Sequence, residues 1–285
     1  MAEYIIGMDV GGTNFRVGLV SEQGEVEKFS KLSVTEVLKT EDVVSDIAVF
    51  LKNFMEDKAV KAIAIGLPAP LDKERKTVLQ APNLPNMDNL PLASLLQEKL
   101  NIPVVMERDV NMCMCYDMEK YSIPSEGVAC AFYFGTGIGN AIFFDGKPYT
   151  GKNGAAGELG HIPCDGSEEV CGCGNVGCME NVAGGKYLKK RYMNFVNNAS
   201  ELDVFVDRMA QTVAAELNIL DPDYVLIGGG VPALENFPTE LLKQRIFERC
   251  RKPYPAENLN MIFTEEHPHK GVLGAAMYFK KYHEK

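Results

Sequence analysis

The sequence predicts an α/β protein that consists of two similar domains. The first observation is a repeat: a strand, a glycine-rich turn and a returning strand occur over residues 4–20 and again over 128–145, and such a repeat indicates a duplicated domain. The second is that short apolar runs at 61–67 and 224–227 alternate with longer segments of helical periodicity, as strands and helices do in an α/β sheet.

The length of 285 residues is enough for two domains with their own cores. We expect the two domains to flank a cleft. The first is a small N-terminal α/β domain over 1–116, which a C-terminal helix over 271–285 closes, and the second is a larger α/β domain over 117–270.

Composition and charge argue against several classes of protein. Hydrophobic residues make up 46% of the chain and charged residues 24%, which is ordinary for a soluble globular protein. The net charge of −10 argues against nucleic acid or an anionic membrane as the main partner. No apolar run approaches the length of about 20 residues that a membrane span needs, and the start, Met-Ala-Glu-Tyr-Ile, lacks the features of a signal peptide. We therefore expect a cytoplasmic protein.

Each glycine-rich turn is a candidate phosphate site. An anion can approach the bare backbone amides of the first turn, which contains Asp9, Gly11, Gly12, Thr13 and Asn14. Asp9 could also hold Mg²⁺ through water, because Mg²⁺ prefers few carboxylates and several waters. An ordinary hairpin turn is an equal alternative for this stretch alone. The second turn repeats the pattern with Gly135, Thr136 and Gly137, so the phosphates of a nucleotide could lie between the two turns.

The following segments alternate between helix and strand. Apolar residues at helical spacing predict a helix over 41–57, and the run at 61–67 predicts a buried strand. The prolines at 68 and 70 impose a loop at the carboxyl end of this strand, where ligands bind in open α/β sheets. A second proline-stiffened loop presents Asn83, which can donate and accept hydrogen bonds, and a helix follows around 91–100.

Asp109 is the candidate catalytic base. Residues 103–107 read as a strand, and Arg108, Asp109 and Asn111 follow at its end, where a helix begins. A carboxylate at a strand end is well placed to accept a proton from a substrate. The alternative is that Asp109 caps the helix, a position that Asp favours strongly, and sequence position alone leaves both roles open.

The segment from 157 to 180 has the composition of a zinc site. One histidine and three cysteines lie between small or turn-forming residues, and glycines at 172, 174 and 177 allow turns that bring thiolates together: His161, Cys171, Cys173 and Cys178. The alternative is three buried cysteines beside a core histidine. Four protein ligands leave no open position for water, so the metal should be structural. We expect the other cysteines to be reduced, at 113, 115, 130, 164 and 250.

Two carboxylates lie on the backbone that this metal would clamp. Glu158 precedes His161 by three residues, and Glu180 follows Cys178 by two. Carboxylates held in this way can accept hydrogen bonds from the hydroxyl groups of a sugar, because each has two acceptor oxygens. Solvated surface acids are the alternative.

The last third of the chain predicts a helix, a strand, a glycine turn and a closing helix. Apolar residues recur at helical spacing over 202–220, and the apolar run at 224–227 reads as a buried strand. Gly228, Gly229 and Gly230 form a permissive turn before the next helix, suited to close contact with a base or ribose. The closing helix over 271–282 is expected to pack on the first domain.

These segments together resemble the ROK family (repressor, open reading frame, kinase) of sugar kinases and sugar-responsive repressors. The resemblance covers essentially the whole chain, and its most specific part is the sugar and zinc signature from Glu158 to Glu180. It implies that the segments Asp9–Arg16 and Gly135–Gly139 bind phosphate, and Arg16 is one of the implied contacts. It also implies adenosine binding by Ile227–Gly230. The family fold is actin-like, a ribonuclease H-like duplication that agrees with the repeated hairpin.

The resemblance also assigns candidate roles. Asp109 takes the place of the catalytic base, and the implied sugar contacts are Asn83, Glu158, His161 and Glu180. Arg108 stands where most family glucokinases have Asn, and Arg presents a different donor geometry. Arg108 and its neighbour Asn111 are therefore further candidates for contact with the sugar. The segments 81–85, 108–111, 149–163 and 251–255 look most like the D-allose kinase branch of the family.

The activity implied is ATP-dependent phosphorylation of the 6-hydroxyl of an aldohexose, with D-allose as the first candidate and glucose, mannose and N-acetylmannosamine as rivals. ATP, Mg²⁺ and a structural Zn²⁺ are the expected cofactors. A sugar-sensing regulator of the same family is the alternative from another class. Family repressors carry a winged helix-turn-helix ahead of the first phosphate motif, which here starts at Asp9. A homodimer is the candidate assembly.

Overall fold

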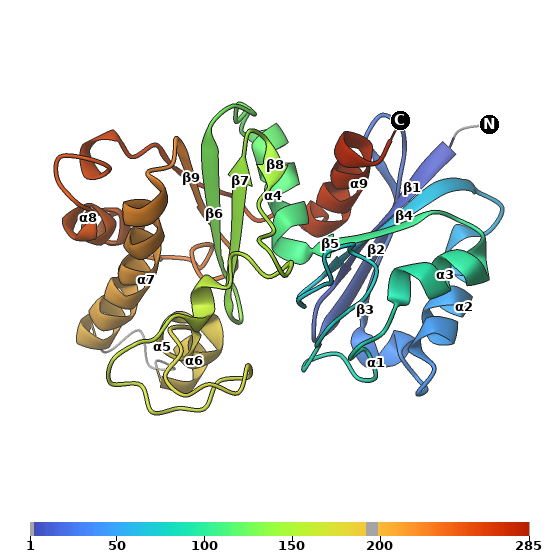
Figure 1. Cartoon of the computed structure of the whole chain (residues 1–285), viewed down its shortest axis with the longest axis horizontal. Helices are drawn as coiled ribbons and strands as arrows, with labels where there is room; N and C mark the ends of the chain where they lie inside the picture. Colours follow the sequence, from blue (N-terminus) through green and yellow to red (C-terminus); the bar gives the residue numbers. More distant parts are fainter. Residues whose placement is uncertain (1–2, 192–198, 285) are drawn as a thin grey trace. The chain divides into compact units, whose positions relative to one another are not determined.

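The computed structural model describes residues 3–191 and 199–284 (Figure 1), so Met1, Ala2 and Lys285, which belong to the predicted domain ranges, lie outside the described residues. Contacts divide the chain into two compact units. Unit 1 consists of Met1–Ile123, Thr150–Ala156 and His267–Lys285, and unit 2 consists of Pro124–Tyr149 and Gly157–Glu266. The domain boundary predicted after residue 116 stays a prediction.

Unit 1 is built on a five-stranded sheet with the order β3-β2-β1-β4-β5. Strands β1 and β2 form the predicted hairpin and pair antiparallel, while β4 and β5 run parallel to β1. The strands are β1 (Glu3–Val10), β2 (Asn14–Val20), β3 (Val26–Ser33), β4 (Ala59–Leu67) and β5 (Val104–Arg108).

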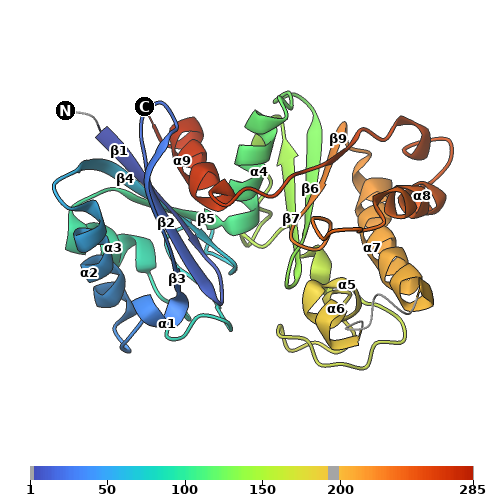
Figure 2. The same ribbon diagram turned by 180° about the vertical axis from the view of Figure 1, so that it is seen from behind.

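Helices cover both faces of this sheet, which explains why β1 and β4 are almost continuously apolar. Figures 1 and 2 show α2 and α3 on one face and α4 and α9 on the other. The helices of unit 1 are α1 (Val34–Val37), α2 (Val43–Met55), α3 (Leu92–Leu100), α4 (Asp109–Lys120) and α9 (Lys270–Tyr282). The predicted helices over 41–57 and 91–100 are confirmed.

The closing helix α9 packs tightly against α4 within unit 1. A Cβ atom at Gly274 would lie only 2.0 Å from the Met112 carbonyl oxygen, so this contact requires glycine. At the start of α9, Lys270 Nζ lies 2.6 Å from Asp117 Oδ2 of α4, and both side chains are buried. The close backbone contact and this ion pair together fix α9 beside the helix that begins at Asp109.

Unit 2 repeats the strand pattern of unit 1. Its sheet has the order β10-β9-β6-β7-β8, in which β6 and β7 form the second predicted hairpin and β9 and β10 run parallel to β6. The strands are β6 (Val128–Phe134), β7 (Ile138–Phe144), β8 (Lys147–Pro148), β9 (Tyr224–Gly228) and β10 (Met261–Phe263). The predicted duplication is therefore confirmed: each half has a hairpin followed by two parallel strands.

The long helix of unit 2 is confirmed as α7 (Ala199–Leu220). Its apolar face is buried in the core of the unit through Phe205, Val206, Met209, Val213 and Leu217. The remaining helical segments are α5 (Glu180–Ala183), α6 (Gly185–Arg191), α8 (Thr239–Arg249), η1 (Leu159–His161) and η2 (Ala256–Asn258). After the triple glycine, α8 begins only at Thr239, because two prolines and Asn236 at a φ of 64° keep the intervening stretch in turns. No helix of the described residues is long and apolar enough to cross a membrane.

A buried glutamate makes the stability of unit 2 depend on pH. Glu216 of α7 accepts a hydrogen bond from Asn140 Nδ2 of β7 at 2.9 Å. Burial raises the pKa of Glu216 from 4.5 to about 7, although hydrogen bonds with Asn140 and Cys130 oppose the shift. The unfolded chain therefore releases this proton at a lower pH than the folded protein, and the free energy of unfolding should fall as pH rises from about 4.5 to about 7.

We predict that Glu216→Gln removes this pH dependence. Gln is a neutral isostere of the protonated acid, so the variant should match the wild type near pH 4 and exceed it by about 3 kcal/mol above pH 8. Urea unfolding at several pH values measures the difference, with the exposed Glu201→Gln of the same helix as the control. A difference that does not change with pH would show that Glu216 does not titrate in this range.

Candidate functional site

A first group of candidate site residues lies where three strands of unit 1 end. Asp9 of β1 pairs with Gly66 of β4, and Leu67 of β4 pairs with Arg108 of β5. The side chains that follow these strands therefore lie at one edge of the sheet, the edge at which open α/β sheets bind ligands.

Asp109 is the first residue of α4, and Arg108 occupies the N-cap position. The structure therefore does not assign the predicted alternative role, helix capping, to Asp109. Its Oδ1 accepts the N–H of Val110 at 2.8 Å, and a Cβ atom at Gly66 would lie 3.3 Å from the Asp109 Cα. Asp109 thus stands directly at the strand ends, held by the first turn of its own helix.

The first glycine turn lies at the same edge. A Cβ atom at Gly12 would lie 2.8 Å from the Asn83 Cβ, so the loop that carries Asn83 packs on this turn. Among the described residues, the amides of Gly12 and Thr13 donate to no acceptor. Successive unused amides in a turn favour an anion, so this turn suits a phosphate.

Asp9 has a partner in the adjacent strand. Arg16 Nη1 of β2 donates to Asp9 Oδ2 at 2.7 Å, which fits their direct pairing in the sheet. Oδ1 of Asp9 accepts no hydrogen bond from the described residues. One available carboxylate oxygen suits Mg²⁺, which keeps most of its ligands as water.

Arg108 and Asn111, the further candidates for sugar contact, are buried. Arg108 Nη1 donates to the carbonyl of Ala156, and Asn111 Nδ2 donates to Glu107 Oε1 at 3.1 Å. Glu107 was not among the predicted site residues. Its only sequence signal is a carboxylate at the end of an apolar strand, where an unpaired charge would be costly.

A second group of candidate site residues lies at the strand ends of unit 2. Ile138 N, just after the second glycine turn, donates to Glu180 Oε2 at 3.0 Å, so this acid lies against the turn. Among the described residues, the amides of Thr136 and Gly137 donate to no acceptor, as at the first turn. Each predicted phosphate turn therefore has two successive amides without an acceptor in the part of the chain that the structure describes.

The triple glycine lies beside the second turn. Val231 N donates to the Phe134 carbonyl at 2.8 Å, and a Cβ atom at Gly229 would lie 2.6 Å from the same oxygen. Cβ atoms at Gly135 and Gly230 would meet no atom within 4 Å. Both backbones thus leave room for a ligand, and the structure brings the predicted phosphate and adenosine segments together in unit 2.

The four predicted zinc ligands form a compact cluster. Their ligand atoms all lie within 4.8 Å of one another, with Cys173 Sγ 3.6 Å from Cys178 Sγ and Cys171 Sγ 3.5 Å from His161 Nδ1. A tetrahedral zinc site with bonds of about 2.3 Å to sulfur and 2.0 Å to nitrogen has S···S and S···N edges of about 3.8 and 3.5 Å. The side chains therefore fit a zinc ion.

Tight turns produce this convergence. Gly174 and Gly177 adopt φ angles of 94° and 81°, as predicted, but Gly172 does not have a positive φ. Gly174 N donates to the Cys171 carbonyl at 2.9 Å, which closes the turn between two ligands. All eight cysteines are free thiols in the structure.

The cysteine environments differ in their effect on protonation. Burial raises the pKa of Cys178 to about 12 and raises the pKa of Cys171, whereas the Asn175 backbone N–H lowers the pKa of Cys173. A bound cation would favour the thiolate form of all three.

Both candidate sugar acids adjoin this cluster. His161 directs Nδ1 toward Cys171, and its Nε2 lies 3.5 Å from Glu158 Oε2. A Cβ atom at Gly160 would lie 3.5 Å from the Glu180 Cβ, so the two acid-bearing segments also touch. Unit 2 therefore brings together the metal cluster, Glu158, Glu180 and the second phosphate turn.

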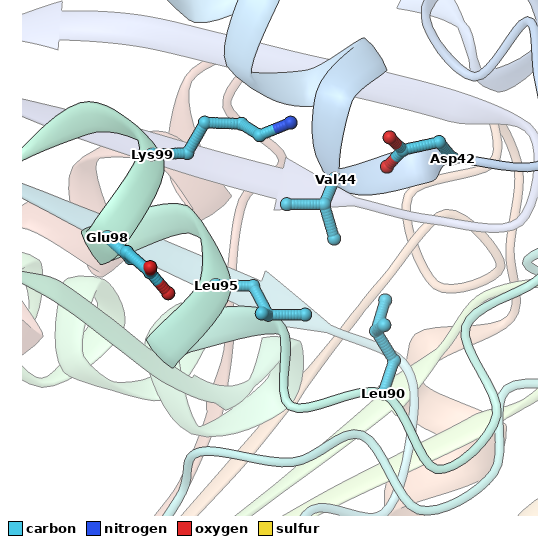
Figure 3. Close-up of a pocket in the computed structure, with 6 residues that line it drawn as sticks. All are labelled: Asp42, Val44, Leu90, Leu95, Glu98 and Lys99. Carbon is cyan, nitrogen blue, oxygen red and sulfur yellow. The ribbon is translucent and has the colours of Figure 1, made fainter.

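A separate surface hollow contains none of these residues. It has a volume of about 500 Å³, and Figure 3 shows the apolar ends of Val44, Leu90 and Leu95 facing one another in it. Asp42, Glu98 and Lys99 complete its lining. The candidate site residues lie at the strand ends of the two sheets, and none of them lines this hollow.

Comparison with known proteins places these features in a family. A model of the ROK family matches residues 5–282. The chain is 27% identical to a glucokinase of Thermotoga maritima, over 97% of each chain. It is 30% identical to a xylose repressor of Caldicellulosiruptor bescii, over 86% of this chain and 70% of the repressor.

A solved structure has the same fold. The crystal structure of a ROK family glucokinase from Streptomyces griseus, in complex with glucose and AMPPNP, matches with a TM-score of 0.82 at 23% identity. The match covers 98% of this chain and 99% of that one. This likeness confirms the predicted actin-like α/β fold.

Proposed function

Because this chain belongs to the ROK family, we propose that it is an ATP-dependent kinase that phosphorylates the 6-hydroxyl of an aldohexose. The observation that carries the proposal is the pair of glycine turns, each with two successive amides that donate to no acceptor among the described residues, of which the first shares a sheet edge with Asp109. Donors of this kind bind phosphate. A carboxylate beside them can accept the proton of the hydroxyl group that receives the phosphoryl group.

In the proposed reaction Asp109 is the general base. It accepts the proton of the sugar hydroxyl as the oxygen bonds to the γ-phosphorus and the bond from phosphorus to the leaving ADP oxygen breaks. The amides of the turns at 11–13 and 135–137 hold the phosphates, while Gly228–Gly230 takes the adenosine. Few acid–base groups are needed, because phosphoryl transfer depends mainly on positioning and electrostatics.

The sugar is held by hydrogen bonds to Glu158, Glu180, His161 and Asn83. Glu158 and Glu180 are acceptors for hydroxyl groups, and the metal cluster next to them keeps their backbone in place. His161, Cys171, Cys173 and Cys178 would hold a Zn²⁺ that stabilises this segment and takes no part in the chemistry. Asp9 would hold Mg²⁺ through water, and the ion would offset charge on the phosphates.

We propose D-allose as the substrate, with glucose, mannose and N-acetylmannosamine as the alternatives. The support is the residue pattern of four segments that resemble the allose branch of the family, Arg108–Asn111 among them. In the structure Arg108 is buried and donates to the Ala156 carbonyl, so it braces the start of α4. An Asn at position 108 would be too short to donate to the Ala156 carbonyl, so Arg108 makes a contact that Asn could not make.

An ADP-release assay over a panel of hexoses tests the proposed function. We expect ADP formation that requires sugar and ATP together, with a kcat/KM for D-allose at least about tenfold above the other sugars. A 6-deoxy sugar should bind without releasing ADP, because it lacks the acceptor oxygen. Sugar binding without ADP release for every hexose would instead identify a sugar-sensing regulator, and preference for another hexose would refute only the substrate.

A further inference from the structure

A buried carboxylate lies next to the candidate base and has no role in the reaction proposed above. Glu107, the residue before Arg108, has 1% of its surface exposed. Its Oε1 accepts the backbone N–H of Arg108 at 2.8 Å and Nδ2 of Asn111 at 3.1 Å. These two donors lie on either side of Asp109 in the chain, so one oxygen fixes the first turn of α4 at both ends.

The other oxygen of Glu107 is held from two distant segments. Tyr278 of α9 donates its hydroxyl to Oε2 at 3.1 Å, and Arg75 Nε lies 3.2 Å from the same oxygen. Burial, together with the charge of Glu107, raises the pKa of Tyr278, so this hydroxyl keeps its proton and remains a donor. Arg75 in turn donates from Nη1 to the Gly154 carbonyl at 3.0 Å.

A buried charge of this kind is costly unless it is paired and hydrogen-bonded, and Glu107 meets both conditions. Three hydrogen bonds and one ion pair on two oxygens leave the carboxylate little freedom to rotate. The orientation of Asp109 depends on the same turn, because Asp109 Oδ1 accepts the N–H of Val110 within it.

We propose that Glu107 is a positioning residue for Asp109. It holds the first turn of α4 so that the Asp109 carboxylate is presented at the distance that proton transfer requires, about 2.6 to 3.2 Å from the acceptor oxygen. Displacement of a reacting group by about 1 Å can cost about 10²-fold in rate. This inference rests on the proposed function, in which Asp109 is the base.

Glu107→Gln tests the inference, because Gln has one acceptor oxygen where Glu107 has two. Its NH2 group must face either Arg108 and Asn111 or Arg75 and Tyr278, so the side chain no longer holds the first turn of α4 in place. We expect kcat to fall by about 10- to 100-fold, while KM for the hexose changes less than about threefold. Glu119→Gln is the matched control, because Glu119 lies on the same helix, is exposed and does not contact Glu107, so kcat should stay within about threefold of the wild type.

A double-mutant cycle with Asp109→Asn separates positioning from a purely structural role. If Glu107 acts through Asp109, Glu107→Gln should lower kcat by less than about threefold in the Asp109→Asn background. The same fold loss in both backgrounds would overturn the inference. If Asp109→Asn alone keeps its turnover, the base assignment of the proposed function fails instead, so the two failures are distinguishable.

Glu107→Gln leaves Arg75, whose side chain is 12% exposed, without its ion-pair partner, and the loss of this pair can prevent folding. Glu107→Gln combined with Arg75→Gln removes both charges, which buried ion pairs often tolerate. Far-UV circular dichroism and a thermal melt establish that this variant is folded. The same cycle with Asp109→Asn then applies to it, with the same outcome for or against the inference.

Discussion

The Asp109→Asn variant is expected to lose about 10²- to 10⁴-fold in kcat, with little change in affinity for the sugar. General-base catalysis contributes an effect of this size, and Asn cannot accept the proton that the sugar hydroxyl releases. The side chains are nearly isosteric, and Asn can still accept the N–H of Val110, which Asp109 bonds at 2.8 Å. The loss should therefore appear in kcat, with KM almost unchanged.

Steady-state kinetics with ATP and the preferred hexose measure this effect, and calorimetry measures sugar binding to both proteins. Asp57→Asn is a suitable control, because Asp57 is exposed and follows α2, outside the strand ends that form the site. It should match the wild type. An Asp109→Asn variant that retained most of its turnover would show that another group takes the proton.

Loss of the metal should have the second largest effect. We expect about one zinc ion per chain in protein purified without chelator, because the cluster has the atom spacing of a tetrahedral site. The free energy of binding structural zinc is about 10 to 16 kcal/mol in peptides, and much of it orders the surrounding chain. The Cys173→Ser variant should therefore lose zinc, and its sugar KM should rise by about 10- to 100-fold.

Elemental analysis and kinetics on the same samples test this pair of effects. Cys164→Ala is the matched control, because Cys164 is a buried cysteine of the same segment but is not part of the cluster. It should keep both zinc and KM. Zinc-free wild-type protein with normal KM would refute the metal site, and zinc loss from Cys173→Ser without any change in KM would separate the metal from sugar binding.

Features set by local sequence could be predicted. The two hairpins follow from glycine turns between apolar runs, and the metal cluster follows from ligands that lie close together in sequence and are joined by glycine turns. In both cases the decisive contacts are between residues near one another in the chain. The periodicity of α7 was equally informative, because its apolar residues line one buried face.

Contacts between distant segments could not be predicted in this way. Glu107 and Tyr278 are 171 positions apart, and Arg75 reaches Gly154 across 79 positions. Neither pair leaves a periodic or motif signal, because each depends on how α9 and the loops pack on the first sheet. Whether Asp109 caps α4 or begins it depends on one residue at the helix boundary, which is finer than periodicity resolves.

The central claim is that Asp109 accepts a proton from the same hexose that Glu158 and Glu180 bind. A crystal structure of the protein with its preferred hexose and a non-hydrolysable ATP analogue tests it most directly. The account predicts that Glu158 and Glu180 accept hydrogen bonds from the sugar while its 6-hydroxyl lies within about 3.2 Å of an Asp109 carboxylate oxygen. A hexose bound by both glutamates with Asp109 beyond hydrogen-bond reach of every sugar hydroxyl would contradict it.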